Sequence, residues 1–115
     1  MFDTSTDAAL AELTAAGRAE SAAAAWKLAV AARVWRLRVE ADARDGVPFT
    51  RRAEFVAVEV STALSVSTAA AHDLMYLGDV LDTRLPAVRA ALERGDLDVS
   101  RVRAIADRTA STCSP

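Results

Sequence analysis

The one histidine of the chain, His72, is the first candidate for catalytic or metal-binding chemistry. On a helix, Asp73 and Asp79 would lie on roughly the same side as His72, which allows a small carboxylate–histidine cluster. Most catalytic triads and metal sites need a nucleophile or further ligands beside the histidine. We therefore favour an exposed histidine on a polar helix face, and keep the cluster as the alternative.

Other groups that could do chemistry have simpler explanations. The carboxylate pairs Glu54 with Glu59 and Asp96 with Asp98 fall on expected surface or in helix caps. Cys113 is the only cysteine, so it cannot form an internal disulfide, and we expect an inert thiol in the tail. The sequence has no glycine-rich phosphate loop. We expect no enzyme activity, no cofactor and no metal.

Residues 60–75, VSTALSVSTAAAHDLM, have the pattern of two short helices joined by a Ser-Val-Ser turn. This pattern is the outline of a helix-turn-helix, the motif that many DNA-binding proteins use. Leu64 and Val66 are expected to be buried at the corner. Ala71 and Leu74 would hold the second helix against the first.

The second helix of this corner has poor side chains for reading bases. Base edges are read by Arg or Lys at guanine and by Asn or Gln at adenine, and the chain contains no Asn or Gln. Arg51 and Arg52 could contact a DNA backbone, which would give position without sequence specificity. We favour a packing corner and keep a DNA-binding module as the alternative. The expected exposed positions are Thr68, Ala69, His72, Asp73, Tyr76 and Asp79.

The hydrophobic periodicity predicts an all-α fold, a compact bundle of about six helices with one long central helix. We expect a first helix that ends at Gly17, with Leu10 and Leu13 on its inner face, and a Thr50 cap on the third. Ser67 and Asp98 are expected to cap the fourth and last helices, and Pro86 to stand in the first turn of the fifth. One domain would span residues 1–115, with a frayed tail at 111–115. The six expected helices cover about 6–16, 18–45, 50–64, 67–82, 86–95 and from 98 onwards.

The long helix at 18–45 is apolar over a wide arc. Trp26 belongs to one apolar stripe along it and Trp35 to a second stripe beside the first. A helix with so wide an apolar face must be covered on more than one side. Either this helix is the centre of the domain, or Trp26 and Trp35 mark a surface for a partner helix, through self-association or a second protein.

Composition limits the class of protein. The chain has 115 residues, a net charge of −2 and 27 alanines, so it is not the basic chain typical of nucleic-acid binding. Its N-terminus does not resemble a secretory signal, and its most apolar window is too short and too charged to span a bilayer. We expect a cytoplasmic protein without a membrane partner.

Three segments resemble a known family. They are EVSTALSVSTAAAHDLM at 59–75, RLPAVRAALERGDLD at 84–98 and VSRVRAIAD at 99–107. In this order they resemble the domain of unknown function 222, also called the 13E12 repeat family of mycobacteria and other actinobacteria. The resemblance covers roughly residues 20–110. Leu85-Pro86, Ala91-Leu92, Gly95-Asp96-Leu97 and Arg103-Ala104-Ile105-Ala106 stand at the matching positions.

The resemblance implies a DNA-related context, such as mobile or phage-like elements, because this helical region usually precedes an HNH nuclease domain in the family. An HNH site needs at least two histidines and typically an asparagine, whereas this chain has one histidine and no asparagine. No HNH residue carries over, and the chain resembles the N-terminal part of such a protein, truncated before the HNH motif. The resulting expectation is a non-catalytic helical module for interaction or oligomerisation.

Overall fold

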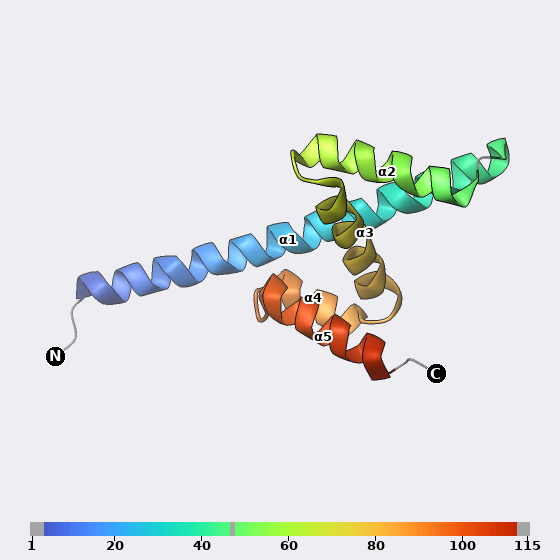
Figure 1. Ribbon diagram of the computed structural model, residues 1–115. Coiled ribbons are helices and arrows are strands. Elements are labelled where there is room, and N and C mark those ends of the chain that lie inside the picture. The colour runs from blue at the N-terminus through green and yellow to red at the C-terminus, as the bar shows by residue number, and fades with distance from the viewer. Residues whose placement is uncertain (1–3, 47, 113–115) are drawn as a thin grey trace. The chain divides into compact units, whose positions relative to one another are not determined.

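The computed structural model describes residues 4–46 and 48–112, and for residues 49, 50, 111 and 112 it describes the backbone alone. This part of the chain is helical and contains no strand, which confirms the all-α expectation (Figure 1). It has five helices rather than six. They are α1 (Thr4–Asp45), α2 (Phe49–Leu64), α3 (Thr68–Thr83), α4 (Pro86–Arg94) and α5 (Val99–Thr112).

The prediction of a separate first helix ending at Gly17 was wrong, because α1 runs through Gly17 without a break (Figure 1). Gly46 and Gly95 have a positive φ, whereas Gly17 does not. The backbone at Gly17 is therefore compatible with a continuous helix. A glycine inside a helix costs about 1 kcal/mol relative to alanine, which the strong helix formers around it can offset. Leu10 and Leu13 were expected on an inner face, but they are 55% and 68% exposed.

The contacts group the chain into two compact units, and α1 contributes to both. The central unit comprises residues 27–84, that is the second part of α1 with α2 and α3. The terminal unit comprises the described residues 4–26 and 85–112, that is the first part of α1 with α4 and α5. The single-domain expectation stays a prediction, and each unit is described by itself.

The core of the central unit lies where α1, α2 and α3 meet. Gly78 of α3 lies so close to α1 that a Cβ built on it would be 2.2 Å from the carbonyl oxygen of Leu28. A glycine here lets the two helix backbones approach closely. Val34, Trp35 and Leu74 pack against the core from its edge. One cluster of buried residues in this core comprises Ala31, Val56, Ala57, Val60, Ala71 and Met75.

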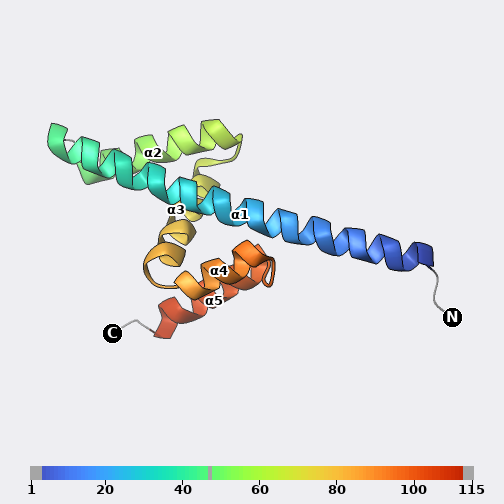
Figure 2. The same cartoon turned by 180° about the vertical axis from the view of Figure 1, so that it is seen from behind.

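The terminal unit depends on a second close approach. Gly95 follows α4 in the left-handed conformation, with φ of 82°, and its N–H donates to the carbonyl of Leu92 at 3.1 Å. A Cβ at Gly95 would lie 2.5 Å from Cγ and 2.9 Å from Cα of Arg18 on α1. The α4–α5 turn is therefore seated directly on α1, and α4 and α5 lie side by side in both ribbon views (Figures 1 and 2).

Several expected helix ends are confirmed. The side chain of Ser67 accepts a hydrogen bond from the N–H of Ala70 and caps α3. Asp98 accepts from the N–H of Arg101 at 2.8 Å at the start of α5, and Pro86 occupies the first turn of α4 as predicted.

The predicted Thr50 cap was wrong. The helix α2 begins at Phe49, with Pro48 at the N-cap position and no side-chain cap bond. Proline fixes φ near the helical value, so it favours a helix start immediately after it. Of the expected frayed tail, residues 111 and 112 belong to α5, whereas Cys113 lies outside the described residues.

No single helix in residues 4–46 and 48–112 is long and apolar enough to cross a membrane. Residues 51–64 and 68–83 reach that length and composition only as a pair, and the pair is bent by 101°.

Candidate interaction site

The corner between α2 and α3 has the geometry of a helix-turn-helix. The two helices are bent by 101°, within the range of about 90–120° for such pairs. Ser65 closes α2 in the left-handed conformation, with φ of 55°, and the N–H of Val66 donates to the carbonyl of Ser61 at 3.0 Å. This hydrogen bond satisfies one of the last carbonyl groups of α2 and allows the short turn.

Burial at this corner differs in part from the prediction. Ala71 is fully buried and Leu74 packs at the edge of the core, as expected. Leu64 and Val66 were expected to be buried, but both are exposed. Leu64 is the last residue of α2 and Val66 lies in the short turn, where little of the chain is available to cover a side chain.

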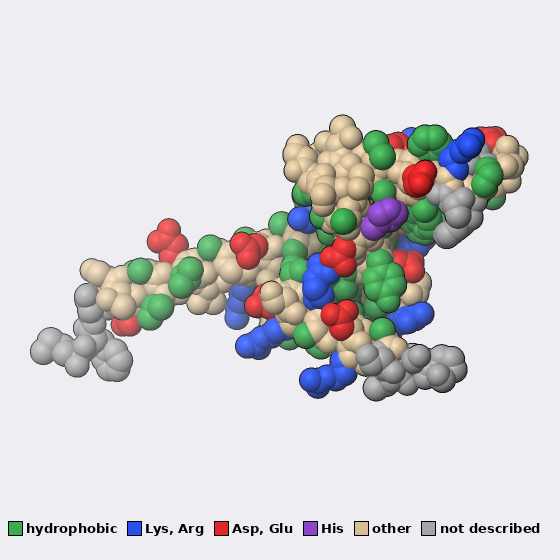
Figure 3. All heavy atoms as spheres, viewed as in Figure 1, with side chains coloured by type: hydrophobic (Ala, Val, Ile, Leu, Met, Phe, Trp, Pro, Cys, Tyr) green, Lys and Arg blue, Asp and Glu red, His purple; other side chains and the backbone are tan. Residues whose placement is uncertain are grey.

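The outer face of α3 is polar and acidic. Thr68, Ala69, His72, Asp73 and Tyr76 are exposed as predicted, and the sequence of α3 contains no Lys or Arg. Figure 3 shows the histidine at the surface. This face offers no cationic donor to a phosphate or to guanine, which are the commonest contacts of a helix in the major groove.

The carboxylates at the end of α3 connect this helix to α1. Asp82 and Asp79 accept hydrogen bonds from the Arg36 guanidinium at 3.0 and 3.3 Å. The hydrogen bond to Asp82, followed by that to Asp79, raises the pKa of Arg36 above its ordinary value. Asp79, which was expected to be exposed, is therefore half-buried, and Asp79 and Asp82 connect α3 to α1 within the central unit.

The two arginines predicted to contact DNA lie in different environments. The side chain of Arg51 is exposed. Arg52 is only 8% exposed, and its Nε lies 3.7 Å from the carboxylate of Asp42 on α1. Because Arg52 is buried against its own chain, only Arg51 presents its charge at the surface. The DNA contact itself stays a prediction.

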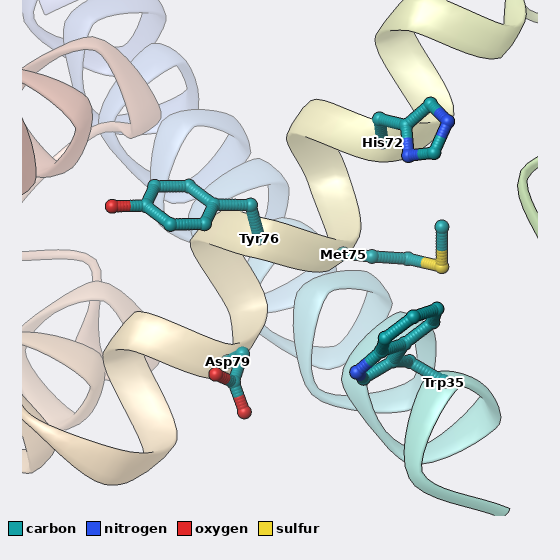
Figure 4. A pocket seen from close by; sticks show the side chains of 5 residues that line it. All are labelled: Trp35, His72, Met75, Tyr76 and Asp79. Atoms are coloured by element: carbon teal, nitrogen blue, oxygen red, sulfur yellow. The ribbon is translucent and has the colours of Figure 1, made fainter. Parts of the chain in front are cut away.

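A shallow cavity of about 190 Å³ lies beside α3 in the central unit (Figure 4). Met75 is buried and Trp35 is half-buried, and they form the apolar side of this notch. His72, Tyr76 and Asp79 complete its lining from successive turns of α3, and the ring of Tyr76 points away from Met75 and Trp35 (Figure 4). The lining of the notch thus combines an indole, a thioether, a phenol, an imidazole and a carboxylate.

Sequence reasoning identified Trp35 and the α3 face separately but not the notch that they form. Trp35 lies far from α3 in the sequence, so only tertiary packing brings them together. The other tryptophan of the predicted partner surface, Trp26, belongs to the terminal unit and is 73% exposed.

The expected alternative of a carboxylate–histidine metal cluster gains no support. Among the described residues, no group of three His, Cys, Asp or Glu side chains is arranged to hold a metal ion. His72 and Asp79 both line the notch, but Asp79 is engaged by Arg36.

The comparisons with known proteins identify the family. The architecture is that of a small all-helical module with an exposed helical corner and a partly apolar notch. The family model described as "Domain of unknown function (DUF222)" matches residues 9–114, and the chain belongs to this family. Searches found no match among curated proteins and none among solved structures.

Proposed function

We propose that this chain is a non-catalytic helical module that binds a protein partner through the notch of the central unit. The observation that carries the proposal is the exposed aromatic side chain of Tyr76, which is 54% exposed and belongs to the lining of the same notch as the buried Met75. Aromatic side chains with one apolar and one polar end are enriched in protein interfaces. Phe55 and Val58 add further exposed apolar surface on α2 of the same unit.

The partner that fits best is an HNH nuclease-type protein. The support is the resemblance to the helical region that usually precedes an HNH domain in this family, together with the histidine and asparagine content of the chain, which is too low for an HNH site of its own. The module would position or oligomerise the nuclease, and the bond-breaking chemistry would belong to the partner.

The test is a titration of the purified chain with the separately expressed HNH domain of a longer family member, followed by isothermal calorimetry. Tyr76→Glu places a charge at the rim of the notch and should weaken binding by about tenfold or more, because desolvating a carboxylate beside an apolar floor is unfavourable. Ala63→Glu, at an exposed position of α2 away from the notch, is the control and should bind like the wild type.

Circular dichroism of both variants checks that the fold is intact. If the wild-type chain gives no heat with the HNH domain, the proposed partner is wrong. If Tyr76→Glu and Ala63→Glu bind equally well, the notch is not the binding surface.

A DNA-binding module is the second candidate, favoured by the 101° corner. Its only exposed cation at the predicted contact is Arg51, and α3 is acidic. Fluorescence anisotropy with a labelled duplex at low salt tests it, since phosphate contacts dominate affinity there. Binding that Arg51→Ala weakens, while the exposed Arg84→Ala leaves it unchanged, would support this candidate. The absence of binding at low salt would eliminate it.

A further inference from the structure

The first four turns of α1 carry an uncovered apolar ridge. Every side chain from residue 4 to residue 20 is exposed, including Leu10 and Leu13. Figure 3 shows hydrophobic and acidic side chains along this segment. Such a segment gains nothing from tertiary packing within its own unit, which is where most of the stability of helices in proteins comes from. We define the Leu10 ridge as residues 4–16 of α1.

This ridge continues a helix face that is already used for packing. Gly17 and Ser21 follow Leu10 at i+7 and i+11, on the same side of the helix. These two residues, with Thr14 and Arg18, line a hollow against the α4–α5 turn at residues 95–98 and against Arg101 of α5. The face of α1 that packs against the α4–α5 turn therefore continues toward the N-terminus, where its side chains are exposed.

A matching concave surface lies on α5 of the same unit. Leu97, Ala104 and Ile105 form the apolar floor of a groove of about 510 Å³. Arg101 and Arg108 flank this floor, and both side chains are exposed. We call this surface the α5 groove. It has the shape and the apolar character to receive a helix ridge.

The ridge and the groove are complementary in charge. The segment 4–20 carries three carboxylates and one arginine, whereas α5 carries three arginines and one aspartate. Asp7 lies one turn before Leu10 and is its neighbour on the helix surface. Glu20 lies two turns after Leu13 on the same side of the helix, just beyond the ridge. An acidic, leucine-bearing helix fits an apolar groove with arginine rims, since opposite potentials meet at the contact.

The ridge and the groove of one chain are not joined to each other. The helix α1 is continuous from Thr4 to Asp45, and Gly95 fixes the α4–α5 turn against Arg18. The ridge therefore projects past the hairpin instead of folding back onto α5, as both ribbon views show for this unit (Figures 1 and 2). The Leu10 ridge of a second copy of the chain has the leucines and carboxylates that fit the apolar floor and the arginine rims of the groove.

We propose that two copies of this chain form a symmetric dimer in which the Leu10 ridge of each copy lies in the α5 groove of the other. Two-fold symmetry makes the exchange reciprocal and doubles the contact. The proposal specifies the self-association of the interaction module proposed above. It uses the terminal unit, whereas the notch belongs to the central unit, so the two sites are tested by different variants.

Sedimentation velocity of the full chain, over a hundredfold range of concentration from about 1 µM, tests the dimer. The wild type should approach twice the monomer mass. Leu10→Glu with Leu13→Glu should keep the chain monomeric throughout, because four carboxylates would enter the two grooves. Leu37→Glu is the matched control at another exposed leucine of α1, 58% exposed in the central unit, and it should dimerise like the wild type.

Charge reversal provides the second arm. Arg101→Glu with Arg108→Glu should weaken the dimer by about tenfold or more, and adding Asp7→Arg with Glu20→Arg to the same chain should restore it. All the exchanged side chains are exposed, and circular dichroism monitors the helix content of each variant.

A wild-type chain that stays monomeric over the whole range would overturn the dimer, and so would a dimer that survives Leu10→Glu with Leu13→Glu. Loss of the dimer in Leu37→Glu would place the interface elsewhere and also overturn it. Calorimetry of the Leu10→Glu, Leu13→Glu variant with the HNH domain separates the two proposals, because partner binding through the notch should persist in it.

Discussion

Gly95 and Gly17 lie in the same unit but face opposite steric conditions. Gly95 has a φ of 82° and no room for a Cβ against Arg18, so Gly95→Ala combines a left-handed alanine with a steric clash. We expect the free energy of unfolding to fall by about 2–5 kcal/mol, from roughly 1–2 kcal/mol for the conformation and 1–3 kcal/mol for overpacking. Urea unfolding followed by circular dichroism measures this loss.

The matched control for this substitution is Gly17→Ala. Gly17 lies within α1 and has nothing within 4 Å of a built Cβ, so the methyl group meets no obstacle. The change should raise the free energy of unfolding by roughly 0.5–1 kcal/mol, since alanine loses less backbone entropy in a helix than glycine. If both alanines destabilised the chain equally, the close approach of Gly95 to Arg18 would not be the cause.

Ser65 is the only non-glycine residue with positive φ among the described residues. A left-handed serine costs about 1–2 kcal/mol, and a glycine there would avoid this strain but lose roughly 0.5–1 kcal/mol through the greater entropy of the unfolded chain. Ser65→Gly should therefore stabilise the chain by up to about 1 kcal/mol in thermal unfolding. A clear loss of stability would show that the serine side chain contributes to the corner.

At the scale of elements, Arg36 connects α1 to α3 through Asp79 and Asp82. Arg36→Ala should lower the free energy of unfolding by roughly 0.5–1 kcal/mol, a small value because Arg36 and Asp79 are each more than 40% exposed and solvent screens the pair. The loss should shrink in about 1 M salt, where the screening length is about 3 Å. An equal loss at low and high salt would contradict an ionic contribution.

The sign of the pKa shift sets the pH range of this contact. The pKa of Arg36 is raised above its ordinary value by its hydrogen bonds to Asp82 and Asp79. A raised pKa gives stability that is complete below the unfolded value and is lost only as the pH rises through the folded value. Deprotonation of Arg36 therefore does not weaken the contact at neutral or mildly alkaline pH, and the stability difference between wild type and Arg36→Ala should be constant there.

The ends of most elements could be predicted because their signals are local. Ser67, Pro86 and Asp98 each act within one helical turn, so their roles follow from a few neighbouring residues. The sequence analysis placed a helix end at both Gly17 and Gly95. Gly95 is followed by a turn, whereas Gly17 is followed by more helix-forming residues. A glycine alone is a weak stop signal inside an alanine-rich helix.

The site was less predictable because it depends on partners distant in sequence. The period of α3 was enough to predict that His72 and Tyr76 are exposed. Arg36 meets Asp79 from 43 residues away, and the burial of Arg52 against Asp42 likewise depends on how α1 and α2 pack. The exposure of Leu10 had the same origin, since periodicity identifies an apolar face but not what covers it.

At the scale of the whole molecule, each unit has its own close helix contact. Gly78→Ala would place a Cβ against the Leu28 carbonyl in the central unit. In native-state hydrogen exchange, it should lower protection of the α2 and α3 amides more than that of the α4 and α5 amides, because local opening follows contiguous cooperative units. Gly95→Ala should show the reverse pattern. Equal losses across all five helices would indicate a single cooperative unit.

The positions of the two tryptophans have a spectroscopic consequence. The chain has only these two indoles, and each unit contains one, Trp26 in the terminal unit and Trp35 in the central unit. Trp26 is surrounded by water, whereas Trp35 packs against the central core, so their emission spectra should differ in the native state. Replacing Trp26 by phenylalanine would leave a natural fluorophore that reports on the central unit and its notch without any attached dye.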